Sequence, residues 1–455
     1  MYKKLRFYLR FIRALTAKHW LPILLGLTLA VISAIVAPRL FILGNRIGNV
    51  RRIGIIGRYT LNDLPLSLMQ KVSIGLTNLD PTGVASPGIA SSWQATDSGK
   101  TYIFTIDRSL VWHDGSSVKS QDIRYNFRDA SIEYPDSDHL LIKLTDPFSP
   151  LPSVVSRPVL KTSGLLTRFN RPQISGLGTY RIKSYRKNGS LLSILTLVPV
   201  PSNSALPGLI YHFYSSGDQA RLALKLGILH EIVGLTEPND LSSWSNLEIN
   251  SHTQKDRYIG IFFNTQDPQL SGPSGKNLRL ALTYAIDKSR WSDRALGPIS
   301  PESWAFNSEV KKYDLDPAKA KELLKKVEKI PESVILSTVP AYSEIAEDIK
   351  KDWSAIGVDT KIIVSTELPS EYQIILIAQA IPSDPDQYNL WHSTQDTTNL
   401  SRLKNPRIDK LLEDGRKTSD YAVRFGIYSD FQKFLLEEAP AVFLFYPNSF
   451  NISRK

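Results

Sequence analysis

Four short motifs in the sequence carry residue types that could support chemistry. His113 and Asp114 are adjacent, and a histidine oriented by an aspartate is the general base of many hydrolases. His230-Glu231 begins the zinc-protease helix pattern, and Gly275-Lys276 resembles the end of a phosphate-binding loop. Gly176-Leu177-Gly178 resembles the start of a dinucleotide-binding turn. Any one of the four would indicate an enzyme or a nucleotide-binding protein.

Three of these motifs fail on spacing. Gly234 stands where the second histidine of a zinc-protease helix belongs. In the phosphate-loop pattern, Leu270 replaces the leading glycine and Asn277 replaces the hydroxyl that binds magnesium. The Gly176 motif lacks its third glycine and a following helix, and the seven histidines are scattered, with no close pair. We therefore predict no metal ion and no cofactor.

The pair His113-Asp114 has a structural alternative to catalysis. It follows the alternating segment TYIFTI (101–106), which predicts a strand that is buried on one face. Gly115 can adopt positive φ and Asp114 can cap the backbone, so the three residues suit a turn. The sequence contains no G-x-S-x-G nucleophile elbow. We predict a turn here and no catalytic residue.

Charge is distributed unevenly along the 455 residues. The formal charge is +11, but residues 1–52 hold ten Lys or Arg and no acidic residue. The remainder holds 45 basic and 44 acidic residues, a net charge of +1. A basic face for nucleic acid is therefore not predicted. An apolar content of 42% and a charged content of 22% are those of an ordinary folded protein.

The basic excess flanks a candidate membrane segment. Trp20 to Ala37 is uncharged and mostly apolar, and as a helix it would extend about 27 Å, enough to cross a bilayer core. The positive-inside rule then predicts a cytoplasmic tail at 1–18, an anchor at 19–38, a linker at 39–52 and an extracytoplasmic main domain. A cleaved signal peptide is the alternative, with Pro38 as the first mature residue. The absence of cysteine excludes a lipid-anchor cysteine, a disulfide and a thiolate metal site.

The folded part divides by its periodicity. Residues 53–252 contain short alternating segments between turns and are predicted to be strand-rich. Residues 253–436 mix helices with strands. A helix is expected from about Asn277, and another is capped by Asp316 and extends through Val327. Segments 333–339, 341–357 and 360–365 read as strand, helix and strand, which predicts an α/β fold with a parallel sheet.

Residues 86–127 (SPGIASSWQATDSGKTYIFTIDRSLVWHDGSSVKSQDIRYNF) resemble the signature of the family-5 extracellular solute-binding proteins, the peptide and nickel receptors of ABC importers. Further segments resemble that family in the same order: residues 176–180, 218–234, 258–265, 278–291, 313–320 and 437–447. The resemblance spans roughly residues 60–447. In the family the His-Asp-Gly segment belongs to the scaffold, in agreement with the turn.

The resemblance implies a two-lobed fold like that of periplasmic binding proteins, of type II and the large peptide-receptor subclass. Lobe I would comprise residues 53–252, including an inserted subdomain, lobe II 253–436, and the return to lobe I 437–455. The chain would cross near 251–258 and 436–442, at the hinge. Implied partners are an oligopeptide or similar solute, held between the lobes of a monomeric receptor, and an ABC permease with its ATPase.

The expected ligand site follows from the same resemblance, with one departure. The family commonly holds the peptide amine with an aspartate, but Ile381 occupies that position here. Either Asp384 or Asp386 replaces it, or the ligand has no free amine; a third alternative is that the two aspartates form only a turn. Nickel binding is not predicted. The remaining candidates are two aromatic residues that either line the cleft or pack in the core, and five residues from two loops: Tyr388, Trp391, Gly75, Thr77, Asn78, Asn264 and Thr265.

Two other functions stay open at this stage. An extracytoplasmic hydrolase would need a nucleophile or metal site, and the motifs supply neither. A receptor-like sensor or scaffold that no longer serves transport is the other alternative, and the altered amine position favours it.

Overall fold

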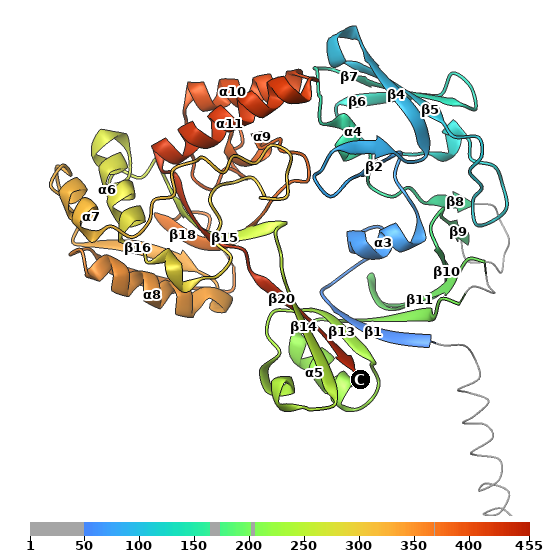
Figure 1. Ribbon diagram of the computed structural model, residues 1–455, viewed down its shortest axis with the longest axis horizontal. Helices are drawn as coiled ribbons and strands as arrows, with labels where there is room; N and C mark the ends of the chain where they lie inside the picture. Colours follow the sequence, from blue (N-terminus) through green and yellow to red (C-terminus); the bar gives the residue numbers. More distant parts are fainter. Residues whose placement is uncertain (1–49, 164–172, 202–204, 368) are drawn as a thin grey trace, which may run out of the picture.

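A computed structural model of the protein describes residues 50–163, 173–201, 205–367 and 369–455, arranged in two lobes (Figure 1). The predicted tail and anchor, and most of the linker, lie outside these residues. Within the described part, no helix is both long and apolar enough to cross a membrane. We name the body around the five-stranded sheet lobe II and the body around the seven- and four-stranded sheets lobe I.

Lobe II is a five-stranded mixed sheet with helices on both faces. Strand β15 shows why both faces are buried: Tyr258 and Phe262 point into one core, and Ile259, Ile261 and Phe263 point into the other. A strand covered on both faces needs a continuous apolar run, as here. The strand order is β17 (Asp359–Val364), β16 (Ser333–Thr338), β18 (Ile374–Ala380), β15 (Arg257–Phe263) and β19 (Ala441–Phe445).

Helices cover both faces of this sheet. One core contains residues of α6 (Gly272–Ala285), α7 (Pro317–Leu324) and α8 (Ser343–Ser354). The opposite core contains residues of α9 (Tyr388–Trp391), α10 (Pro406–Lys417) and α11 (Tyr421–Glu438). The predicted β-α-β unit is confirmed, because β16 and β17 pair in parallel around α8.

Two helix boundaries were predicted wrongly. Helix α6 begins at Gly272, five residues before the expected start, because its first turn has the turn-like composition Gly-Pro-Ser-Gly. Gly275 is needed there, since a Cβ would lie 2.1 Å from the carbonyl carbon of Leu270. Helix α7 ends at Leu324 rather than at Val327, after starting at the predicted Asp316 cap.

Lobe I contains a seven-stranded sheet with α3 (Leu66–Val72) and α5 (Gly217–Lys225). Helix α5 packs on one face of that sheet and covers only part of it, through Ala220, Ala223 and Leu224. The strand order is β10 (Tyr180–Asn188), β11 (Leu191–Pro199), β12 (Gly208–Tyr214), β1 (Val50–Ile56), β13 (Glu231–Leu235), β20 (Asn448–Arg454) and β14 (Leu247–Thr253).

The second part of lobe I is an antiparallel four-stranded sheet. Its strand β5 alternates as predicted, with Tyr102, Phe104 and Ile106 buried and the intervening residues partly exposed. The order is β4 (Ala90–Thr96), β5 (Thr101–Ile106), β7 (His139–Leu144) and β6 (Ala130–Glu133). Nearby are the short helix α4 (Leu151–Val154) and the ribbons β2 (Thr77–Leu79) with β3 (Ala85–Pro87) and β8 (Lys161–Ser163) with β9 (Gln173–Ser175).

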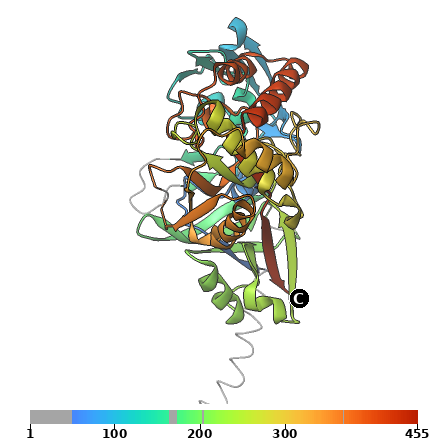
Figure 2. The same ribbon diagram turned by 90° about the vertical axis from the view of Figure 1, so that its left-hand side faces the viewer.

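Two short segments join the lobes. The chain leaves the seven-stranded sheet after β14 and enters the lobe II sheet at β15, across residues 254–256. It returns between β19 and β20, at residues 446–447, and the Gln254 N–H donates to the carbonyl of Pro447 at 2.8 Å. The predicted return at 436–442 is therefore too early, because β19 still pairs with β15 in lobe II. Figure 2 shows α10 and α11 at one end of the molecule and α5 at the other.

Candidate functional site: the contact between the lobes

A cavity of about 770 Å³ lies where the four-stranded sheet of lobe I meets lobe II. Its size is that of a small-ligand site. Three aromatic side chains, Phe127, Phe148 and Tyr388, line it together with aliphatic groups. Charges of both signs surround these groups: Arg128, Asp129, Asp146, Glu413, Arg416 and Lys417. The cavity can therefore take a ligand with apolar groups and opposite charges.

The segment before α9 carries a buried ion pair beside this contact. Asp384 accepts a hydrogen bond from a terminal nitrogen of Arg424 on α11 at 2.7 Å, and only 8% and 2% of the two residues are exposed. The Arg424 Nε–H donates to the carbonyl of Gly415 at 3.1 Å. Burial raises the pKa of Asp384, and the charge of Arg424 opposes that rise. The pair fixes this segment against α10 and α11.

Asp386 forms a second, less buried pair at the edge of the cavity. It accepts from Nε of Arg416 on α10 at 2.9 Å. The Arg416 guanidinium lies 3.9 Å from the centre of the Tyr388 ring and 5.3 Å from that of Phe148. A guanidinium over an aromatic face is attracted by the ring electrons. Arg416 thereby links one aromatic ring from each lobe.

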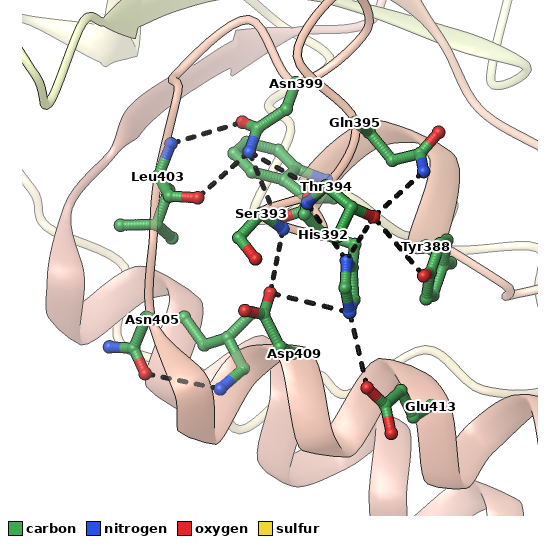
Figure 3. A network of polar contacts seen from close by, with 12 residues as sticks. Tyr388, His392, Ser393, Thr394, Gln395, Asn399, Leu403, Asn405, Asp409 and Glu413 are labelled. Atoms are coloured by element: carbon green, nitrogen blue, oxygen red, sulfur yellow. Dashed lines mark hydrogen bonds and ion pairs between the residues drawn. The ribbon is translucent and has the colours of Figure 1, made fainter.

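A polar network behind Tyr388 holds its ring in place (Figure 3). The His392 ring stacks on Tyr388 with centroids 4.0 Å apart, and its Nδ1 lies 2.8 Å from Oγ1 of Thr394. The backbone N–H of Ser393 donates to Asp409 of α10 at 2.9 Å. The Asn405 side chain caps the first turn of α10. These contacts hold the Tyr388 ring in one orientation at the wall of the cavity.

Lobe I reaches the contact with α4 and one loop. The backbone N–H of Ser149 donates to the carbonyl of Arg416 at 2.7 Å, and the Ser153 hydroxyl donates to Asp384 at 3.2 Å. A second contact joins the loop after β2 in lobe I to Trp304 in lobe II. The Trp304 N–H donates to the carbonyl of Thr82 at 3.0 Å. Both contacts join residues that are far apart in the sequence.

Gly75 and Thr77 lie next to α4. A Cβ on Gly75 would lie 2.3 Å from the carbonyl oxygen of Ser156, so this position needs glycine. The Thr77 hydroxyl donates to the carbonyl of Pro152 in α4. Asn78 donates to Pro87 across the β2–β3 ribbon at 2.9 Å. These residues support the lobe I side, and the cavity lining contains none of them.

Three other candidates lie elsewhere in lobe II. Asn264 and Thr265 follow the end of β15 that is remote from the crossover, a distance of about 24 Å for seven extended residues. Their side chains are buried and donate to the carbonyls of Tyr372 and Arg402. Trp391 is 1% exposed and packs in the core. Of the nine candidates, the structure brings Asp384, Asp386 and Tyr388 together.

Several residues at the contact carried no signal in the sequence. Arg416 and Arg424 lie on helices that follow α9, with no spacing that relates them to their aspartates. Phe148, Ser149 and Ser153 belong to a Pro-rich stretch that is typical of any loop. These residues face lobe II because of how the two lobes are arranged, and no local sequence pattern predicts that arrangement.

The His113-Asp114 turn is confirmed. Gly115 has φ of 84°, and its N–H donates to the carbonyl of Trp112 at 2.8 Å. Asp114 accepts from the Ser116 N–H at 2.9 Å, and His113 Nε2 lies 2.8 Å from the carbonyl oxygen of Gly178. The histidine therefore ties the turn to the segment before β10.

A two-lobed α/β chain with a cavity between its lobes has the architecture of a solute-binding receptor. The family described as "Bacterial extracellular solute-binding proteins, family 5 Middle" matches residues 85–131 and 128–401. The chain belongs to this family, that of the peptide and nickel receptors of ABC importers, whose members work outside the cytoplasm.

Relatives and solved structures agree with this assignment. The chain is 24% identical to the probable D,D-dipeptide-binding periplasmic protein DdpA of Escherichia coli (strain K12), over 79% of each chain. It is 22% identical to the dipeptide-binding protein of the same strain, over 87% and 86%. The fold matches NikZ of Campylobacter jejuni in complex with Ni(L-His), with a TM-score of 0.71, 22% identity and coverage of 90% and 94%. It also matches the oligopeptide-binding AppA of Bacillus subtilis in complex with a nonapeptide, with a TM-score of 0.66, 19% identity and coverage of 90% and 95%. Both Escherichia coli relatives are named as binding proteins.

Proposed function

We propose that the protein is a membrane-anchored receptor that binds oligopeptides between its lobes and delivers them to an ABC permease. The cavity between the lobes carries this proposal, because it combines aromatic faces with charges of both signs. Peptides present the same combination of apolar side chains, hydrogen-bonding backbone and terminal charges. The names of the dipeptide- and oligopeptide-binding relatives support the same ligand class.

Two carboxylates at the contact between the lobes are already paired with arginines, which limits the ligand groups that they can bind. Asp384 and Asp386 are paired with Arg424 and Arg416, so neither is available for a ligand amine without losing its arginine. Breaking a buried pair leaves an uncompensated charge. A free ligand amine would therefore pair with another carboxylate of the cavity lining, Asp129, Asp146 or Glu413, and the aromatic or aliphatic groups of the ligand lie against Phe148 and Tyr388.

A peptide library tests this proposal. The purified protein is incubated with the library, and the bound molecules are identified by mass spectrometry. We expect intact peptides on the wild-type protein and at least tenfold less on Tyr388→Ala. Phe425→Ala removes an aromatic ring exposed on α11 and is the matched control, with no loss expected. Cleaved peptides would indicate a hydrolase instead.

A sensor or scaffold without transport is the second candidate. It is favoured by the hydrogen bonds that join the two lobes directly, such as Ser149 N–H to the carbonyl of Arg416 and Trp304 N–H to the carbonyl of Thr82. In that case no peptide would be recovered from the library, although the protein would show the cooperative unfolding of a folded chain.

The anchor is part of the proposal and rests on residues 19–38 of the sequence. Membrane fractions are washed with alkaline carbonate and the protein is located by antibody. An uncleaved helix keeps the full-length chain in the membrane pellet. A soluble product that begins near Pro38 would contradict the anchor and indicate a cleaved signal peptide.

A further inference from the structure

The outer face of the seven-stranded sheet is only partly covered. Helix α5 packs over its β13 side, in a cluster that includes Tyr214. His212, two residues earlier on the same face of β12, instead lines an open groove of about 360 Å³. Figure 1 shows β1 and α5 at the lower end of the molecule, away from α10 and α11. This face is therefore remote from the cavity between the lobes.

The groove has an apolar floor and a positive rim. Ile194, Ile210 and Ile228 form the floor, and Arg52 and Arg186 stand at the rim with exposed side chains. The lining contains no acidic residue. Among the ion pairs of the described residues, none includes either arginine. Such a rim attracts anions.

The apolar surface continues from the groove onto α5. Leu222 is 57% exposed, Leu226 is 67% exposed, and Ile228 in the groove is 45% exposed. Exposed aliphatic side chains next to unpaired cations are typical of surfaces that lie in the interface of a membrane. A partner protein of acidic character is attracted by the same arginines, but it gains from these aliphatic side chains only if it carries a matching apolar surface.

We propose that this surface, formed by the groove and the C-terminal end of α5, rests on the anionic phospholipid headgroups of the membrane that holds the protein. The inference depends on the anchor proposed above. Twelve residues separate Ala37, the last residue of the uncharged apolar segment, from Val50 at the start of β1. Fully extended, they reach about 40 Å, so the β1 end of lobe I stays near the bilayer. Arg52 follows two residues later.

Single-cysteine labelling tests the proposal, because the natural sequence has no cysteine. The full-length chain carrying Leu226→Cys is labelled with bimane and placed in nanodiscs of phosphatidylcholine, with or without phosphatidylglycerol. A nitroxide on the lipid headgroup serves as the quencher. Lys410→Cys, on α10 with a side chain 65% exposed, is the control. We expect at least threefold stronger quenching at position 226 than at position 410, in anionic discs only.

Charge reversal completes the test. Arg52→Glu with Arg186→Glu should reduce quenching at position 226 to the level of the control, while peptide binding stays unchanged. Equal quenching at both positions in anionic discs, with the chain retained in the discs, overturns this inference and leaves the anchor intact. Quenching that needs an added permease also overturns it, in favour of a protein partner. A chain that does not enter the discs overturns both.

Discussion

In lobe II, the side chains at the contact are held between a buried sheet and three helices, whereas lobe I reaches the same contact with a four-residue helix and a loop. Asp384 and Arg424 are almost fully buried, and a network of hydrogen bonds supports Tyr388. Ser153 lies on α4 and Ser149 lies just before it, and α4 has no capping side chain. The difference indicates that lobe II provides a fixed half of the site and lobe I the half that docks onto it.

Removing Arg424 should have the largest effect on the free energy of unfolding, because Arg424 belongs to the half of the site that lobe II holds fixed. Arg424→Met leaves Asp384 buried without its partner, and we expect a loss of about 3–5 kcal/mol in the free energy of unfolding. Urea unfolding of lobe II measures this loss. Lys433→Met, on the exposed side of α11, should change stability by less than about 0.5 kcal/mol.

A double variant tests whether the loss of stability comes from the unpaired charge of Asp384. Arg424→Met with Asp384→Leu removes both charges, so most of the loss should be recovered. If the single variant is as stable as the wild type, the pair does not hold the fixed half together.

A buried lysine in lobe II gives a pH-dependent prediction. Lys288 donates to the carbonyls of Thr283 and Tyr313, and burial lowers its pKa to about 7. Above pH 7 the folded protein has released a proton that the unfolded chain keeps up to pH 10.5. Stability should therefore rise from pH 7 to 9, with a contribution of up to about 1.4 kcal/mol per pH unit.

Lys288→Met isolates this contribution. The difference between the unfolding free energies of wild type and variant should change over pH 7–9 with that slope. A difference that is constant with pH would mean that Lys288 stays charged in the folded protein.

The smallest expected effect lies on the docking half. Ser153→Ala removes one hydrogen bond from lobe I to Asp384 and leaves the ion pair intact. We expect the docking of the lobes to weaken by about 0.5–1.5 kcal/mol, with unfolding of lobe II unchanged. Fluorescence energy transfer between labels on the two lobes reports the docked fraction. Ser91→Ala, whose hydroxyl donates to Thr105 within the four-stranded sheet, is the control.

The fold was predictable where its pattern is local. Strand β15 is an unbroken apolar run, and the crossover around α8 has complete strand, helix and strand periods. The site was predictable only in part. Asp384 and its neighbour Tyr388 lie near each other in the chain, but Arg424 is 40 residues away. The resemblance suggested Asn264 by its place after β15 and gave no information on which end of the strand faces lobe I.

Hydrogen exchange with and without a bound peptide tests the central claim most directly. The peptide recovered from the library should slow exchange on both sides of the cavity, in residues 144–154 of lobe I and in residues 413–417 of lobe II. Slowing confined to one lobe, or to segments remote from this cavity, would contradict a ligand held between the two halves.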